Sequence, residues 1–181
     1  MSASLGLIWP SLRAAAVAFC PPFEVAAEDP QRLSIDLGEE AGGRTLRLRY
    51  RSERGLFLRT YYLVIQAELA GEGPAEPGTL ELRRGKLRWK RPAPRDGKRW
   101  SEVLLSGEAR AALKKLQVER LVLAWEPRRA SWHVALETLS GAVTVTFFPP
   151  LMTPNPFRRE EARALDALLD AFKQAPTQTP A

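Results

Sequence analysis

Few residues of this 181-residue chain have the chemistry that catalysis or metal binding needs. His133 is the only histidine and Cys20 is the only cysteine. A structural zinc site of the usual kind needs four cysteine and histidine ligands, so the sequence excludes it. A lone cysteine forms no disulfide within the chain. Triads with a histidine base would depend on His133 alone, where we expect a solvated histidine on a strand.

Carboxylates offer the remaining route to catalysis. The adjacent pairs Glu39-Glu40 and Glu160-Glu161 point apart, because neighbouring side chains leave the backbone in different directions. Glu68 and Glu137 lie on predicted strands, and two acids converging on one cleft would make an enzyme without histidine. The chain contains no glycine-rich phosphate loop, G-x-S-x-G or H-E-x-x-H motif. We therefore expect no cofactor and no metal, and a carboxylate-based enzyme stays an alternative.

Positive charge is the clearest chemical signal in the sequence. The net charge of the chain is +6, and its distribution along the chain is uneven. Residues 44–100 hold fifteen basic and six acidic residues, a local net charge of +9. Residues 1–43 have a net charge of −4, and residues 101–181 a net charge of +1. The middle third is therefore where an anionic partner is expected to bind.

Strand alternation arranges much of this charge. In the segments 45–51 and 79–91, leucine and aromatic side chains alternate with arginine and lysine, so the cations share the outer strand faces. The loop 91–100 adds further cations and an exposed tryptophan. Such a face binds phosphate backbones and stacks bases, although a solvated face or a charge-protected sheet edge explains the same pattern. The predicted polyanion-binding residues are Arg47, Arg49, Arg51, Arg83, Lys86, Arg88, Lys90, Arg95, Lys98, Arg99 and Trp100.

The elements that position these residues follow from periodicity and turn signals. The chain predicts an α+β fold with a mainly antiparallel sheet of about eight strands, because the strands are joined by short loops. Three helices, at the N-terminus, middle and C-terminus, are expected to cover one face of the sheet. The predicted strands are 32–37, 45–51, 56–69, a hairpin over 79–91 turning near Gly85, 120–125, 131–138 and 142–148. A loop rich in alanine and acidic residues is expected before the first strand, and Gly42-Gly43 predicts a turn after it. The predicted helices run from Pro10 to about Phe19, from an N-cap at Ser106 to Leu116, and onwards from an N-cap at Asn155-Pro156. The last helix is expected to bury an apolar stripe of Leu165, Leu168, Leu169 and Phe172.

Residues 1–175 are expected to form one domain, followed by a flexible tail over 176–181. The apolar stretch near the N-terminus is broken by Pro10 and Arg13 and is too short to span a bilayer. We therefore expect a cytoplasmic protein, with a lipoprotein signal ending at Cys20 as the weaker alternative. The proline-rich segment 147–157 is expected to be extended, either packed on the domain or offering an apolar edge to a partner.

These observations predict a soluble, non-enzymatic binding or interaction protein, with a polyanion such as nucleic acid on its basic sheet face. A protein partner is a further alternative. So is a domain that holds a small apolar ligand between sheet and helix. The walls of that cavity would be Tyr61, Tyr62, Trp125, Trp132 and Phe147.

Overall fold

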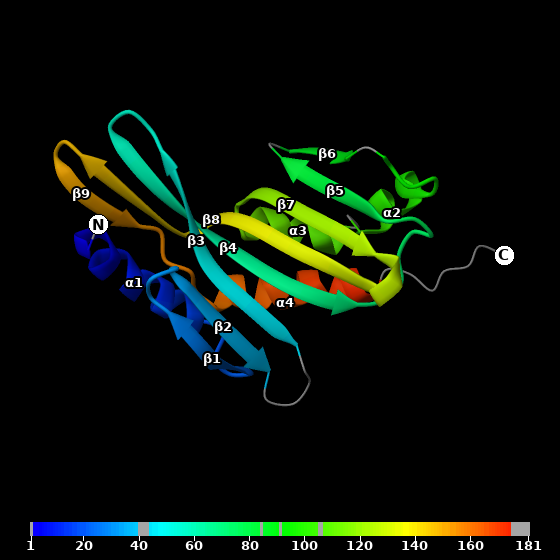
Figure 1. Cartoon of the computed structure of the whole chain (residues 1–181), viewed down its shortest axis with the longest axis horizontal. Helices are drawn as coiled ribbons and strands as arrows, with labels where there is room; N and C mark the ends of the chain where they lie inside the picture. Colours follow the sequence, from blue (N-terminus) through cyan, green and yellow to red (C-terminus); the bar gives the residue numbers. More distant parts are fainter. Residues whose placement is uncertain (1, 40–43, 84, 91, 105–106, 175–181) are drawn as a thin grey trace.

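The computed structural model describes residues 2–39, 44–83, 85–90, 92–104 and 107–174. Within them, nine strands form one antiparallel sheet with helices against it, which confirms the predicted α+β class (Figure 1). The strands are ordered β1-β2-β3-β4-β8-β7-β5-β6, and β9 pairs with β8. The strands are β1 (Phe23–Asp29), β2 (Ser34–Glu39), β3 (Thr45–Arg54), β4 (Leu58–Ala70), β5 (Gly78–Arg83), β6 (Lys86–Trp89), β7 (Val118–Glu126), β8 (Ser131–Phe147) and β9 (Pro150–Pro154). The helices are α1 (Ser2–Val17), α2 (Gly97–Leu104), α3 (Gly107–Lys115), α4 (Arg159–Gln174) and the 3₁₀ turn η1 (Pro127–Arg129).

One face of the sheet is apolar and packs against helices. α1 contacts β2, β3 and β8, α4 contacts β4, and α3 contacts β7 and α4. On β3, Leu46, Leu48 and Tyr50 are buried while the alternating arginines are exposed, because successive side chains point to opposite faces. The predicted stripe of α4, Leu165, Leu168, Leu169 and Phe172, is buried against this face. The helices therefore leave the opposite face of the sheet, named here the open face, to the charged side chains.

The strand β8 replaces the two strands predicted over 131–138 and 142–148. It runs unbroken through an irregularity, since Tyr61 pairs with Val143 whereas Leu63 pairs with Thr138. The extra residues bulge out, and Gly141 within them has a positive φ of 84° that favours glycine. Side chains hold the bulge: the Tyr50 hydroxyl donates to the Gly141 carbonyl at 2.7 Å. A long strand with a local bulge thus replaces the break between the two predicted strands.

Two predicted helix starts are wrong. α1 begins at Ser2 and contains Pro10, because Ile8 and Leu12 lie one turn apart and are both buried in the core. α4 begins at Arg159, so Asn155 does not cap it. Instead the Asn155 side-chain amide donates to the Leu139 carbonyl at 2.7 Å and supports the bulge in β8.

Three elements were missed by the sequence patterns. β1 lies where an acidic loop is expected. Its pairing with β2 makes this segment a strand, and its composition does not indicate that pairing. α2 replaces the second half of the predicted loop 91–100. β9 shows that the proline-rich segment pairs with β8, which places this segment on the sheet. The predicted N-cap Ser106, the Gly42-Gly43 turn and the tail 176–181 lie outside the described residues.

Candidate functional site

The open face brings together the cations of β3 with those of the β5–β6 hairpin. The register runs from Arg49 through Val64 and Glu137 to Arg120 and then Arg83, so one row of side chains crosses five strands. Between β3 and β5 there are four strand spacings of about 4.8 Å, or roughly 19 Å in total. The two basic segments therefore share one face, as predicted, but three strands separate them.

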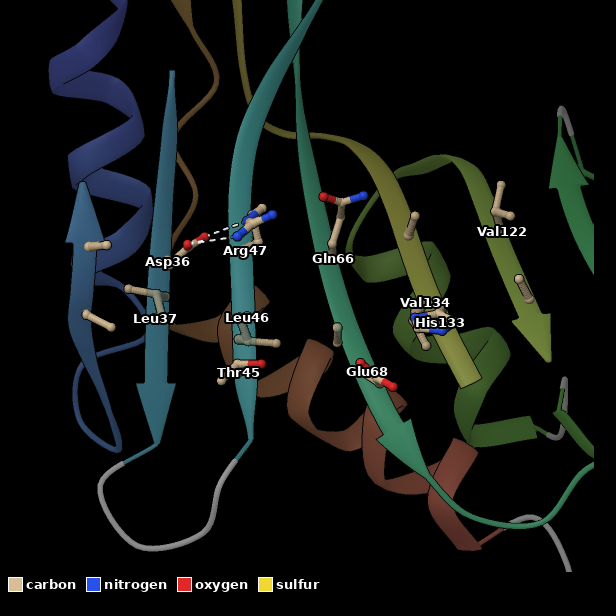
Figure 2. A pocket seen from close by; sticks show the side chains of 15 residues that line it. Asp36, Leu37, Thr45, Leu46, Arg47, Gln66, Glu68, Val122, His133 and Val134 are labelled. Carbon is tan, nitrogen blue, oxygen red and sulfur yellow. Dashed lines mark hydrogen bonds and ion pairs between the residues drawn. The ribbon is translucent and has the colours of Figure 1, made fainter. Parts of the chain in front are cut away.

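Three of the predicted binding cations on the open face are neutralised by carboxylates. The Arg47 guanidinium makes two hydrogen bonds to Asp36, at 2.7 and 3.0 Å (Figure 2). This pairing lowers the pKa of the Asp36 carboxyl, chiefly through the hydrogen bond from Arg47. Arg51 lies 2.9 Å from Glu137, and Lys90 lies 3.4 Å from Glu81. These side chains hold strands together, so an anionic partner would have to compete with their acids.

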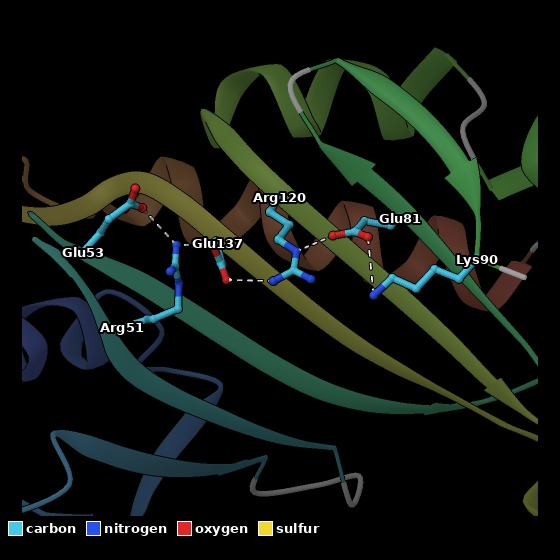
Figure 3. A network of polar contacts seen from close by, with 6 residues as sticks. All are labelled: Arg51, Glu53, Glu81, Lys90, Arg120 and Glu137. Atoms are coloured by element: carbon cyan, nitrogen blue, oxygen red, sulfur yellow. Dashed lines mark hydrogen bonds and ion pairs between the residues drawn. The ribbon is translucent and has the colours of Figure 1, made fainter.

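Two of these pairs belong to a longer chain of charges across the sheet. Figure 3 shows it running between β3 and β6 over the open face. Burial tends to raise the pKa of Glu81, but the hydrogen bond and charge of Arg120, together with Lys90, lower it overall. Glu137 lies at the centre with a side chain only 11% exposed, between Arg51 and Arg120. The chain of charges comprises Glu53, Arg51, Glu137, Arg120, Glu81 and Lys90.

Four predicted cations on this face are exposed and have no ion-pair partner among the described residues. They are Arg49, Arg83, Lys86 and Arg88. Arg83 lies directly opposite Lys86 in the β5–β6 hairpin and beside Arg120 on β7. Like charges directly opposite one another cost stability unless an opposite charge joins them. These four cations, named here the free cations, are therefore the part of the predicted site that is open to an anion.

The predicted loop residues do not join the open face. Trp100 lies on α2, is only 8% exposed, and packs against Trp132 with ring centroids 6.1 Å apart. The prediction of an exposed tryptophan is therefore wrong, because the segment is helical and turns the ring inwards. Trp89 alternates with the outward cations of β6 and therefore points away from the open face. Its indole N–H donates to the Gly97 carbonyl at 2.7 Å, so α2 contacts β6 on the side of the sheet opposite the open face. Arg95, Lys98 and Arg99 are exposed there, and Arg95 lies 3.7 Å from Glu76.

A hollow of about 630 Å³ lies over the centre of the open face (Figure 2). Its floor contains the short side chains of Val122, Ala124 and Ala135. The hollow forms because these short side chains leave space between their longer neighbours. Arg47 borders it on β3 and His133 on β8. The volume falls within the range of small-molecule sites. Sequence patterns did not indicate this hollow, although the run of small residues on β7 and β8 is the signal that marks it.

The alternative sites predicted from sequence do not assemble. Glu68 pairs with His133 and Glu137 pairs with Val64, so the two acids lie four residues apart along neighbouring strands, or about 13 Å. Glu68 borders the large hollow, whereas Glu137 borders a separate polar hollow of about 300 Å³. The two carboxylates therefore do not converge on one cleft.

The aromatic walls of the predicted apolar cavity are distributed differently. Tyr61, Trp125 and Trp132 are buried in the hydrophobic core, with exposures of 7%, 7% and 1%. Tyr62 borders the smaller hollow beneath the Arg51 guanidinium, 5.4 Å from its ring centre. Phe147 is 40% exposed at the end of β8. None of the five lines the large hollow.

Comparison with known proteins gives a family and no function. In the described residues, no helix combines the length and apolar character needed to cross a membrane. No curated protein and no solved structure matches the chain. Residues 20–175 match the family described as "Protein of unknown function (DUF3156)". The match spans most of the chain, from shortly after α1 through α4, and so the chain belongs to the DUF3156 family.

Proposed function

We propose that this protein is a non-enzymatic binding protein that receives an anionic partner on the open face of its sheet. The free cations carry the proposal, because they are exposed cations on one face with no acid paired to them among the described residues. Nucleic acid is the first partner to test, since its phosphates are regularly spaced and its affinity for cations is strongly salt-dependent.

The contacts with this partner are electrostatic. Base stacking would need exposed aromatic rings, but Trp100 is buried and Tyr62 lies under Arg51. Recognition then depends on phosphate groups at the two sides of the face, near Arg49 and near the β5–β6 hairpin. Such binding has little sequence preference, and its affinity falls steeply as salt concentration rises.

A second candidate is a small ligand in the large hollow. It is favoured by the volume of about 630 Å³ and by the short side chains of the floor. This candidate differs from the cavity between sheet and helix that the sequence suggested, because the hollow lies on the side away from the helices. An anionic small molecule there would approach Arg47, whereas a polyanion would reach beyond the hollow to the free cations.

Two variants of equal net charge test the proposal. In the open-face variant, the free cations are changed to glutamine: Arg49→Gln, Arg83→Gln, Lys86→Gln and Arg88→Gln. The helix-layer variant is the matched control and removes four exposed cations from α3 and α4: Arg110→Gln, Lys114→Gln, Lys115→Gln and Arg163→Gln. Binding to a labelled single-stranded oligonucleotide is measured by fluorescence anisotropy at several salt concentrations.

We expect the wild-type protein to bind at low salt and the open-face variant to lose affinity by about tenfold or more, with a shallower salt dependence. The helix-layer variant should bind within about threefold of wild type, because only overall charge has changed. An Ala135→Trp variant fills the hollow and leaves the free cations unchanged, so it tests the second candidate separately from the first. No binding at low salt, or equal losses in the two charge variants, would contradict the proposal.

A further inference from the structure

Exposed apolar side chains gather at one end of the molecule. Among the described residues, nine large hydrophobic side chains are exposed, and seven of them lie at two hairpin turns. Leu56 and Phe148 are 86% and 87% exposed, and Phe57 is 65% exposed. Isolated exposed apolar residues are ordinary, but a cluster of this kind marks a contact surface. The apolar tip patch comprises Leu56, Phe57, Leu58, Phe147, Phe148, Leu151 and Met152.

The two turns form one structure. The tip of the β3–β4 hairpin lies beside the tip of the β8–β9 hairpin, since Leu58 pairs with Thr146. The Phe147 amide donates to the Phe57 carbonyl at 2.9 Å and links the turns directly. Figure 1 shows both hairpins projecting from the body of the sheet on the same side, at the upper left. The patch is therefore a protruding, connected apolar surface.

Several backbone groups at these tips are paired within the chain. The Gly55 amide donates to the Leu58 carbonyl at 2.8 Å. The Thr146 hydroxyl donates to the Pro149 carbonyl at 2.7 Å and accepts from the Leu151 amide at 3.2 Å. Pro149 and Pro150 have no amide hydrogen to satisfy. A segment that enters the apolar part of a bilayer must satisfy its backbone internally, and these hairpins meet much of that requirement.

Positive charge lies immediately behind the patch. Arg54 and Arg59 face one another across β3 and β4, and neither has an ion-pair partner within the described part of the chain. The Arg59 guanidinium lies 3.5 Å from the Tyr61 hydroxyl, which brings no negative charge. The β8–β9 hairpin contains no acidic residue, since the sequence has no Asp or Glu between 138 and 159. Two opposed arginines behind an apolar tip complement a surface of anionic headgroups.

We propose that the apolar tip patch docks onto anionic lipid bilayers, inserting Phe57 and Phe148 at the boundary between headgroups and acyl chains. Aromatic and leucine side chains favour this boundary, and Arg54 and Arg59 then lie at the depth of the lipid phosphates. A protruding tip suits a deformable surface. A protein partner or a second copy of this chain would instead have to present a matching cavity. The lipid surface is separate from the open face and independent of the function proposed for it.

Vesicle co-sedimentation tests this docking. The 181-residue chain is mixed with vesicles of phosphatidylcholine alone or with added phosphatidylglycerol. The patch variant Phe57→Ser with Phe148→Ser removes two exposed rings, and Val17→Ser is the matched control, because Val17 is 62% exposed on α1 outside the patch. A third variant, Arg54→Gln with Arg59→Gln, tests the charge.

We expect wild type and the Val17 control to bind the phosphatidylglycerol vesicles alike. The patch variant should lose about tenfold or more in partition coefficient, and the arginine variant about fivefold or more. The open-face and helix-layer variants should bind these vesicles equally, which separates docking from binding on the open face. Urea unfolding verifies that each variant is folded, and Leu56→Ser with Leu151→Ser replaces the patch variant if it is not.

Three results would overturn the proposal. Wild-type protein that stays in the supernatant with both kinds of vesicle excludes lipid docking. A folded patch variant that sediments with vesicles as wild type does assigns the binding to another surface. Finally, a dimer in analytical ultracentrifugation that the patch variant dissociates, without vesicle binding by the wild type, would show that a second copy of this chain covers the patch.

Discussion

Glu137 is the carboxylate at the centre of the row of ion pairs that runs from Glu53 to Lys90 across the open face. Neutralising Glu137 tests how much these ion pairs contribute to stability. Its two carboxylate oxygens lie 2.9 Å from the Arg51 guanidinium and 3.6 Å from that of Arg120. The variant Glu137→Gln keeps the shape of the side chain but removes its charge. Arg51 on β3 and Arg120 on β7 would then be two cations on either side of β4 and β8, with only their outer partners, Glu53 and Glu81, to compensate their charge.

The size of this effect follows from exposure. The Glu137 side chain is 11% exposed, whereas those of Arg51 and Arg120 are 44% and 36% exposed. Solvent therefore screens the arginine ends of both pairs, which keeps the loss well below the cost of breaking a fully buried ion pair. We expect Glu137→Gln to lower the free energy of unfolding by about 1–2 kcal/mol. For a chain of this length, the thermal midpoint would fall by about 2–8 °C.

Urea unfolding followed by circular dichroism measures this difference. Glu119→Gln is the matched control, because Glu119 is exposed on β7 and has no ion-pair partner among the described residues. It should change the free energy of unfolding by less than about 0.5 kcal/mol. Raising the salt concentration should reduce the difference between the two variants, since it screens the exposed arginines. Equal unfolding free energies for the two variants would refute this reasoning.

The bulge of β8 and the Asp36 pair give two further predictions. Gly141 and Gly85 both have positive φ angles, but a Cβ at Gly141 would lie 2.6 Å from Leu63, whereas the space at Gly85 is open. Gly141→Ala should therefore cost about 2–4 kcal/mol and Gly85→Ala only about 1 kcal/mol in urea unfolding, and similar costs would contradict the steric argument. Arg47 lowers the pKa of Asp36 in the folded state, so this pair stabilises the fold above the ordinary pKa range of aspartate. That contribution, about 0.5 kcal/mol after solvent screening, should be the difference between wild type and Asp36→Asn at pH 7. It should disappear as the pH falls through the lowered pKa, and a difference that persists in acid would count against the pair.

Local pattern predicted the faces of the strands correctly. The alternation of leucine and arginine in 45–51 assigned each side chain to its face, because the two-residue period of a strand depends only on the backbone. The buried stripe of the last helix followed in the same way from a 3.6-residue period. Patterns of this kind also placed the free cations outward. They could not reveal that Arg47, Arg51 and Lys90 meet Asp36, Glu137 and Glu81, since those acids come from other strands.

Element boundaries depended on contacts between distant segments. Pro10 marks a helix start in isolation, but burial of Ile8 extends α1 beyond it. The loop predicted over 91–100 would leave Trp100 exposed, whereas the packing of α2 against the core turns it inwards. In both cases, burying an apolar side chain outweighs the local preference that the sequence displays.

The sequence by itself determined that this protein has an antiparallel α+β fold with a concentration of cations in its middle third. Composition and alternation contain that information, and neither depends on contacts between residues distant in the sequence. The tertiary structure decided which of those cations are free, where the sheet is hollow, and that residues 56–58 and 147–152 form one apolar tip. Strand order and register set these features, since they bring together residues about ninety positions apart whose pairing no local signal specifies.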